Sequence, residues 1–243
     1  DVELDDENHI LRGFEKMVYY NNSFSNLDKI IIHLWPNAYK NSNTNLAKQK
    51  YSDGSTSFKY AESIDLGYID SLDFKVNGEI VKWQFLNEQI DISELLLTKP
   101  LKPGDSIIIT TPFRVKIPSG KFSRLGHIGQ SYQITQWFAK PAVFDKNGWH
   151  PMSYLDQGEF FSEFGNYDVS ITVPKNYVLM ATGDLQNKEE LEFLNEKAEL
   201  TSQLIKENKL AVRDSLGRKD MSFPKSSVCL LYTSDAADDR GCV

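Results

Sequence analysis

The histidines are the first residues to weigh for metal chemistry. They stand at His9, His33, His127 and His150. None is followed by Glu and no two are four residues apart, so the zinc-binding pattern His-Glu-x-x-His is absent. Three acidic residues follow His150 within a short distance, at Asp156, Glu159 and Glu163. We interpret this grouping as loop residues around a buried aromatic corner, and predict no metal ligand and no catalytic residue in this chain.

Nucleophilic and phosphate-binding patterns are also missing. Both cysteines, Cys229 and Cys242, lie in the last fifteen residues, and the chain has no Gly-x-Ser-x-Gly elbow. Two short glycine-containing stretches, 119–121 and 126–129, lack the strand-to-helix setting of a phosphate loop. We expect their glycines to serve tight turns.

The stretch from Gly120 to Gly165 is the richest in aromatic residues, with polar ones between them. Such a mixture fits either a carbohydrate-binding surface or a core with a functional rim. Buried aromatic side chains dominate packing energetics, so we favour the core.

Composition narrows the classes of protein. The 243 residues are 40% hydrophobic and carry a net charge of -7, which argues against a nucleic-acid partner. No apolar run is long enough to span a membrane. The compartment stays open, with a periplasmic or secreted location slightly favoured over the cytoplasm.

The elements that must position any site are predicted to be strands. Asn77-Gly78 supplies the positive φ angles of a two-residue hairpin turn, and Leu101–Asp105 is a second turn. The predicted strands are Ile10–Tyr20, Lys29–Trp35, Tyr68–Val76, Ile80–Phe85, Ser106–Thr111, Phe113–Ile117, Tyr132–Phe138, Tyr167–Val173 and Tyr177–Ala181. Short strands with regular turns predict a mainly β fold, an antiparallel β-sandwich or saddle.

The last quarter of the chain changes character. Residues 187–209 lack Gly and Pro and carry leucines at roughly helical spacing, so a short charged helical segment is expected there. We divide the chain into a β-sandwich domain at 1–186, a helical insertion with a return towards the sandwich at 187–227, and a tail at 228–243. The tail from Cys229 resembles a translated sequencing adapter, and we expect it to be non-native.

Several motifs, in order, resemble the aminopeptidase N family of gluzincin metallopeptidases, in a branch common in Bacteroidetes-type bacteria. The stretches that carry the resemblance are His33–Lys40, Phe122–Gly129, Tyr132–Trp137, Lys140–Asp145, Gly148–Met152, Gln157–Phe164, Ser170–Pro174 and Ala181–Gly183. The resemblance covers residues 1–227, and its specificity lies in the order and number of the motifs.

This resemblance implies a non-catalytic N-terminal β-domain that helps to form the substrate cleft of a zinc-dependent aminopeptidase. The zinc and the His-Glu-x-x-His motif would belong to a C-terminal catalytic domain, beyond the point where this chain ends. We therefore expect no cofactor in this chain, zinc in the full-length parent, and the amino terminus of a peptide substrate as the ligand.

One binding residue is carried over by the resemblance. The family has a Thr/Ser-Gln pair that reaches the substrate amine, and Thr135-Gln136 matches it. Gln136 is therefore the candidate substrate-binding residue, because an amide carbonyl can accept from an ammonium group. Phe138 departs from the Gln or Glu usual two positions later, and the Ala-Arg that commonly follows is missing. A strand residue satisfied by neighbouring backbone is the alternative interpretation of Gln136.

Two other functions stay open. One is a stand-alone β-sandwich module that binds peptides or glycans through the aromatic region. The other is an inactive family member that kept the fold and lost its metal ligands. The sequence downstream of this chain distinguishes them.

Overall fold

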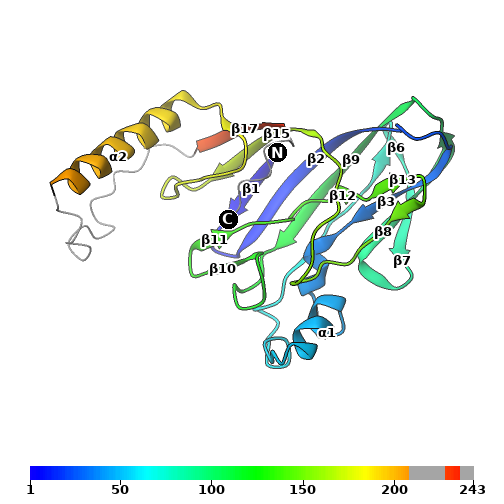
Figure 1. The fold of residues 1–243 in the computed structure, drawn as a ribbon, viewed down its shortest axis with the longest axis horizontal. Coiled ribbons are helices and arrows are strands. Elements are labelled where there is room, and N and C mark those ends of the chain that lie inside the picture. The colour runs from blue at the N-terminus through cyan, green and yellow to red at the C-terminus, as the bar shows by residue number, and fades with distance from the viewer. Residues whose placement is uncertain (208–227, 236–243) are drawn as a thin grey trace. The chain divides into compact units, whose positions relative to one another are not determined.

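The computed structural model describes residues 1–207 and 228–235. The chain forms two compact units: residues 5–163, and residues 1–4 together with the described part from residue 164 onward. The mainly β, antiparallel fold predicted from the turns is confirmed, with a helix near the C-terminus (Figure 1). The larger unit carries every candidate site residue.

Two antiparallel sheets build the larger unit. The first has the strand order β2-β9-β5-β6, with β4 also paired to β9. Its strands are β2 (Ile10–Tyr20), β9 (Ser106–Lys116), β5 (Lys75–Val76), β6 (Glu79–Ile80) and β4 (Tyr68–Asp70). The second has the order β12-β3-β8-β7. Its strands are β12 (Lys140–Pro141), β3 (Leu27–His33), β8 (Gln89–Leu101) and β7 (Lys82–Leu86).

A core lies between these sheets. Phe74, next to β5, packs edge-on against Trp83 of β7 with ring centroids 5.6 Å apart. Strand β3 is buried at four consecutive residues, Ile30–His33, because both of its faces are covered. On one face Ile31 packs with Ile92 and Ala142, and Trp149 adds to this cluster.

Smaller elements surround the sheets. The 3-10 helix η1 (Trp35–Tyr39) and the helix α1 (Asn45–Ser52) follow β3. Thr44 caps α1 by accepting from the Ala47 N–H at 3.2 Å. Two hairpins complete the unit: β10 (Gly126–Ile128) with β11 (Ser131–Gln133), and β13 (Val143–Asp145) with β14 (Gly148–His150).

The other unit is a small mixed sheet with one helix. Strand β1 (Val2–Asp5) runs parallel to β15 (Asn166–Val173), which pairs antiparallel with β17 (Val228–Asp235). Strand β16 (Asp184–Leu185) pairs with β17, and α2 (Lys188–Lys206) begins after Asn187. Part of the predicted tail thus forms β17; residues 208–227 and 236–243 lie outside the described residues, and the domain limits and the non-native tail stay predictions.

Several predicted elements are confirmed and others are wrong. Prediction and structure agree at strands β2 and β15 and at the one continuous helix α2. They also agree at the turn Asn77-Gly78, whose φ angles are 51° and 86°. The strand predicted to reach Trp35 ends at His33, because Trp35 begins η1. Tyr177–Ala181 forms no strand.

The predicted break at Pro112 is also wrong, since β9 runs through it. On the side away from β2, strand β9 pairs with β4 at residues 114–116 and with β5 at residues 109–110. Pro112 falls in the gap between these two partners, where a missing N–H costs no ladder hydrogen bond.

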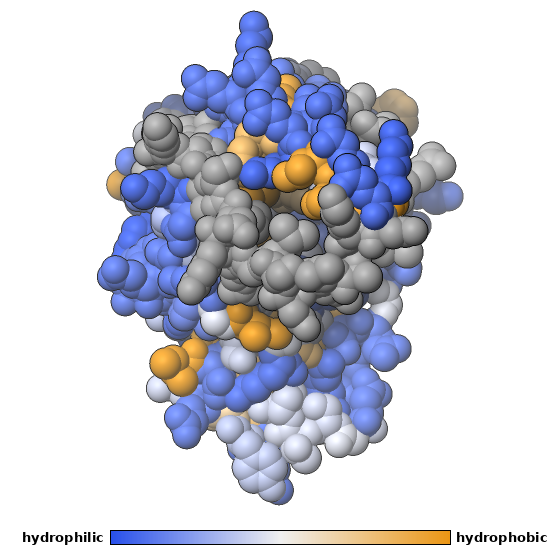
Figure 2. Space-filling model, turned by 90° about the vertical axis from the view of Figure 1, so that its left-hand side faces the viewer, coloured by the Kyte–Doolittle hydropathy of each residue, from blue (hydrophilic) through white to orange (hydrophobic). Residues whose placement is uncertain are grey.

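No helix among the described residues is long and apolar enough to cross a membrane. On the face seen in Figure 2, hydrophilic side chains dominate the coloured surface and hydrophobic ones form small patches.

Candidate functional site

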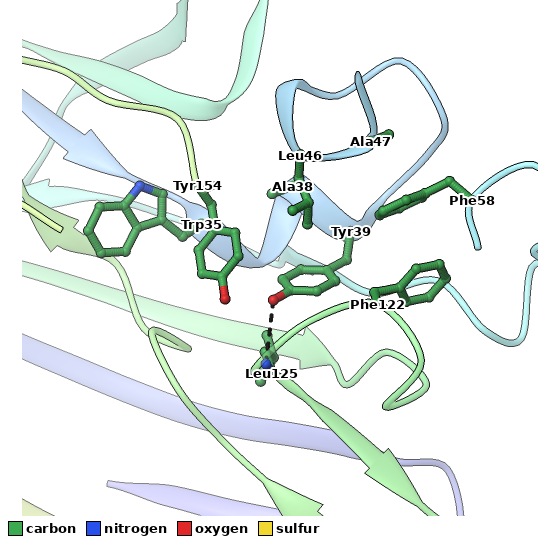
Figure 3. Close-up of a cluster of buried hydrophobic side chains, with 9 residues drawn as sticks. All are labelled: Trp35, Ala38, Tyr39, Leu46, Ala47, Phe58, Phe122, Leu125 and Tyr154. Carbon is green, nitrogen blue, oxygen red and sulfur yellow. Dashed lines mark hydrogen bonds between the residues drawn. The ribbon is translucent and has the colours of Figure 1, made fainter. Parts of the chain in front are cut away.

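One buried cluster joins most of the motifs that carry the family resemblance. Its fully buried members are Trp35, Ala38, Tyr39, Leu46, Ala47, Phe58, Phe122, Leu125 and Tyr154 (Figure 3). Partly buried residues pack against it, among them Ile134, Trp137, Met152 and Phe160. Stretches separated by more than a hundred residues in the sequence therefore meet in one place, which we call the aromatic cluster.

This burial decides between the two interpretations of the aromatic region. Phe122 and Tyr154 are each 1% exposed, and in the stretch 120–165, all of which is described, only Phe161 and Phe164 are exposed aromatic side chains. The core interpretation is confirmed for the cluster.

Hydrogen bonds to Met152 fix the edge of the aromatic cluster. The Trp35 indole N–H donates to the Met152 carbonyl at 2.9 Å, and the Met152 N–H donates to Nε2 of His33 at 3.2 Å. The His33 and Trp35 rings stack with centroids 4.5 Å apart. Burial, with a smaller effect of Lys140, lowers the pKa of His33 to about 4. His33 is thus a neutral structural residue at neutral pH.

A polar chain leads from the cluster to its rim. The Leu125 N–H donates to the Tyr39 hydroxyl at 3.4 Å, and the Ser123 hydroxyl lies 3.3 Å from that of Tyr154. Ser123 also donates to Asp156, which forms an ion pair with Lys50 at 2.6 Å. Burial opposes ionisation of Asp156, but its donors Lys50 and Ser123 outweigh burial and lower its pKa. These bonds hold the aromatic rings in fixed positions.

Gln136 lies beside this fixed framework, in a bend between β11 and β12. The prediction that it stands on a strand is wrong, because β11 ends at Gln133 and Gln136 has a left-handed φ of 51°. Such a backbone is uncommon for a residue with a side chain and requires support from its surroundings. The support comes from Ile134 and Trp137, which pack on the aromatic cluster, and from Phe113, whose ring centroid is 5.8 Å from that of Trp137.

Gln136 is half-buried, and its side chain has no hydrogen-bond partner within the described residues. In the described residues no hydrogen bond joins this amide to neighbouring backbone, contrary to the alternative interpretation of Gln136. The adjacent Thr135 hydroxyl is buried and likewise has no partner in the described chain. A half-buried amide on a rigid bend can accept from, or donate to, a ligand.

The histidines do not come together as a metal site. His150 Nε2 lies 2.8 Å from Asp145 Oδ1, while Asp156 is taken by Lys50 and Ser123. Across residues 1–207 and 228–235, no group of three or more His, Cys, Asp or Glu side chains could hold a metal ion. The family resemblance expects its zinc in a separate catalytic domain, so we derive no step through a metal here.

Comparisons with known proteins find only distant structural similarity. No known protein family matches the chain, and no curated protein does. A mutant M1 zinc metallopeptidase from Deinococcus radiodurans, solved with a Tyr-Ser-Ala substrate, superposes with a TM-score of 0.41 and 13% identity over 76% of this chain and 34% of its own. The M1 zinc metallopeptidase of the same organism gives 0.39 and 14%, over 74% and 32%. This chain spans about a third of the length of those two structures.

Proposed function

We propose that this chain is a non-catalytic β-domain of a zinc-dependent aminopeptidase-like metallopeptidase, and that Gln136 contacts the amino terminus of a peptide substrate. The observation that carries the proposal is the Gln136 amide, which has no partner in the described chain and stands on a bend held by the aromatic cluster. The motifs that resemble the aminopeptidase N family supply five of the nine fully buried residues of that cluster: Trp35, Ala38, Tyr39, Phe122 and Leu125. Peptide hydrolysis would belong to the full-length parent.

The chemistry of the site suits a charged amine. An amide carbonyl accepts from an ammonium without a second charge to desolvate, and a hydrogen bond to a charged group contributes about 1.5–3 kcal/mol. The proposal assigns hydrolysis to the parent, so the role of this domain would be to bind and orient a substrate.

Titration of the isotope-labelled chain with a short peptide tests this proposal. We expect a peptide with a free amino terminus to shift the resonances of residues 134–139, and its N-acetylated twin to leave them unchanged. Gln136→Ala should weaken binding by about tenfold, the loss of one charged hydrogen bond. Gln133→Ala is the matched control, because Gln133 is an exposed amide on the neighbouring strand β11.

Two results would contradict the proposal. Equal binding of both peptides would remove the role of the amine, and one tightly bound zinc per chain in metal analysis would remove the non-catalytic assignment. Sequencing the gene downstream adds a third check, since the proposal expects His-Glu-x-x-His about one domain further on.

A further inference from the structure

Two Asn-Gly pairs lie in hairpin turns of the larger unit, and the proposed function uses neither. Asn77-Gly78 joins β5 to β6, and Asn147-Gly148 lies in the turn between β13 and β14. Both asparagines are exposed. An atom added as Cβ at either glycine would meet nothing within 4 Å in the described chain, so water can reach both turns.

An Asn-Gly pair can react with itself, because glycine has no side chain to hinder its backbone nitrogen. That nitrogen bonds to the carbonyl carbon of the Asn side chain, and the side-chain nitrogen leaves as ammonia, taking the Gly amide proton. The product is a cyclic succinimide. Water then breaks one of the two C–N bonds of the ring, restores the N–H and leaves either aspartate or isoaspartate.

The Asn77 amide is held in place by β9. Its Oδ1 accepts from the Ile108 N–H at 2.9 Å, and the Asn77 backbone N–H donates to the Ile108 carbonyl at 2.8 Å. Attack by Gly78 draws the Asn77 side chain towards its own backbone and so breaks the bond to Oδ1. The need to break one hydrogen bond lowers the reactive fraction by about tenfold, so Ile108 protects Asn77.

The Asn147 side chain has no such restraint. Its backbone N–H donates to Asp145 Oδ1 at 2.7 Å, but its side-chain amide makes no hydrogen bond within the described residues. The turn consists of Lys146 and Asn147 alone, between the paired Asp145 and Gly148. The side chain of Asn147 can therefore rotate towards the Gly148 nitrogen without losing a partner.

We propose that Asn147 is a site of spontaneous deamidation, with water as the only co-reactant, and that Ile108 protects Asn77 from the same reaction. Both asparagines have the same reactive neighbour and similar exposure, so the difference lies in the hydrogen bond to the side chain. Neither claim depends on a peptide ligand, and the proposal therefore stands apart from the proposed function.

The modification would alter a turn that supports buried side chains. It places a new carboxylate two residues after Asp145, which lies 2.8 Å from His150 Nε2. Isoaspartate also adds one carbon to the backbone, so the pairing of Asp145 with Gly148 cannot persist unchanged. Trp149 follows directly and packs on the buried cluster around Ile31, so the change should reach this cluster.

Peptide mapping by mass spectrometry of the wild-type chain, aged at mildly alkaline pH, tests the proposal. The same incubation in guanidinium chloride gives the rates in the unfolded chain and so corrects for the different neighbours of the two pairs. After this correction, we expect Asn147 to convert at least about tenfold faster than Asn77 in the folded chain. A corrected ratio near one, or no conversion of Asn147, would overturn the proposal.

Two matched variants locate the reaction by charge. Aspartate cannot lose ammonia, and it tolerates the left-handed backbone of residue 77. In ion exchange, the first acidic species should form at the wild-type rate in Asn77→Asp and at least about tenfold more slowly in Asn147→Asp. The reverse order would overturn the proposal. In the ageing wild type, the Trp149 indole resonance should shift as Asn147 converts, and an unmoved resonance would contradict the effect on packing.

Discussion

The backbone N–H of Met152 donates to Nε2 of His33 over 3.2 Å, so this buried ring must stay unprotonated at Nε2 to keep the bond. Trp35 stacks on the same ring and donates to the carbonyl of Met152. A buried histidine therefore joins the end of β3 to the loop that follows β14. Acid should break this contact, because a protonated imidazole cannot accept a hydrogen bond.

Stability should fall in acid through His33. Its folded-state pKa of about 4 lies below the ordinary value of 6.5, so its contribution is intact above pH 6.5 and is lost as the pH falls towards 4. The loss amounts to about 3 kcal/mol at about 1.4 kcal/mol per pKa unit. The amide of His33→Gln can accept a hydrogen bond but does not titrate. This variant should therefore be less stable at pH 7, but its stability should change less with pH. Urea unfolding between pH 4 and 7 checks this, and parallel curves for both proteins would contradict it.

Glu15 should make stability depend on pH in the opposite direction. Its folded-state pKa of about 8 lies above the ordinary value of 4.5, so its contribution is intact below pH 4.5 and is lost as the pH rises towards 8. The full loss is about 5 kcal/mol. Glu15→Gln should therefore gain on the wild type steadily between pH 5 and 8 in urea unfolding. A constant difference between the two proteins would show that Glu15 does not titrate in this range.

Local signals predicted several strands of the larger unit. The loose alternation of Ile10–Tyr20 and the Asn77-Gly78 turn specify their elements by short-range chemistry, and both elements are confirmed. Strand β8, in contrast, was not predicted. Its residues Asp91, Ser93 and Glu94 interrupt the apolar pattern, yet all three are buried, because tertiary partners satisfy them. The Asp91 carboxylate, for example, accepts from the Tyr154 N–H at 3.0 Å.

The candidate site was predicted only in part. The resemblance to a family supplied Gln136, but β propensity placed it on a strand that ends three residues earlier. The left-handed bend is supported by Ile134 and Trp137, which pack on the aromatic cluster, and by the contact of Trp137 with Phe113 of β9. Contacts between such separate stretches leave no periodic signal, so the bend could not be predicted from the sequence.

The outward face of β2 and β9 should promote self-association. Val18, Tyr20 and Ile108 are 48%, 60% and 39% exposed, and Val18 lies directly opposite Ile108. Adjacent exposed apolar side chains on a sheet favour association. Sedimentation at rising concentration should show species heavier than the monomer. Val18→Lys should reduce them and Lys16→Gln, on the same face, should not; a monomer at all concentrations would contradict this.

The backbone and the side chain of Gln136 should be separable by substitution. Glycine adopts a left-handed backbone freely, so Gln136→Gly should change the free energy of unfolding by less than about 1 kcal/mol. Valine is β-branched and unfavourable at positive φ, so Gln136→Val should cost about 1–3 kcal/mol. Both variants lack the amide and should lose affinity for an unblocked peptide to the same extent. Urea unfolding and peptide titration of the two proteins check this. If Gln136→Gly bound the peptide like the wild type, the bend alone would make the contact, and the amide would have no part in it.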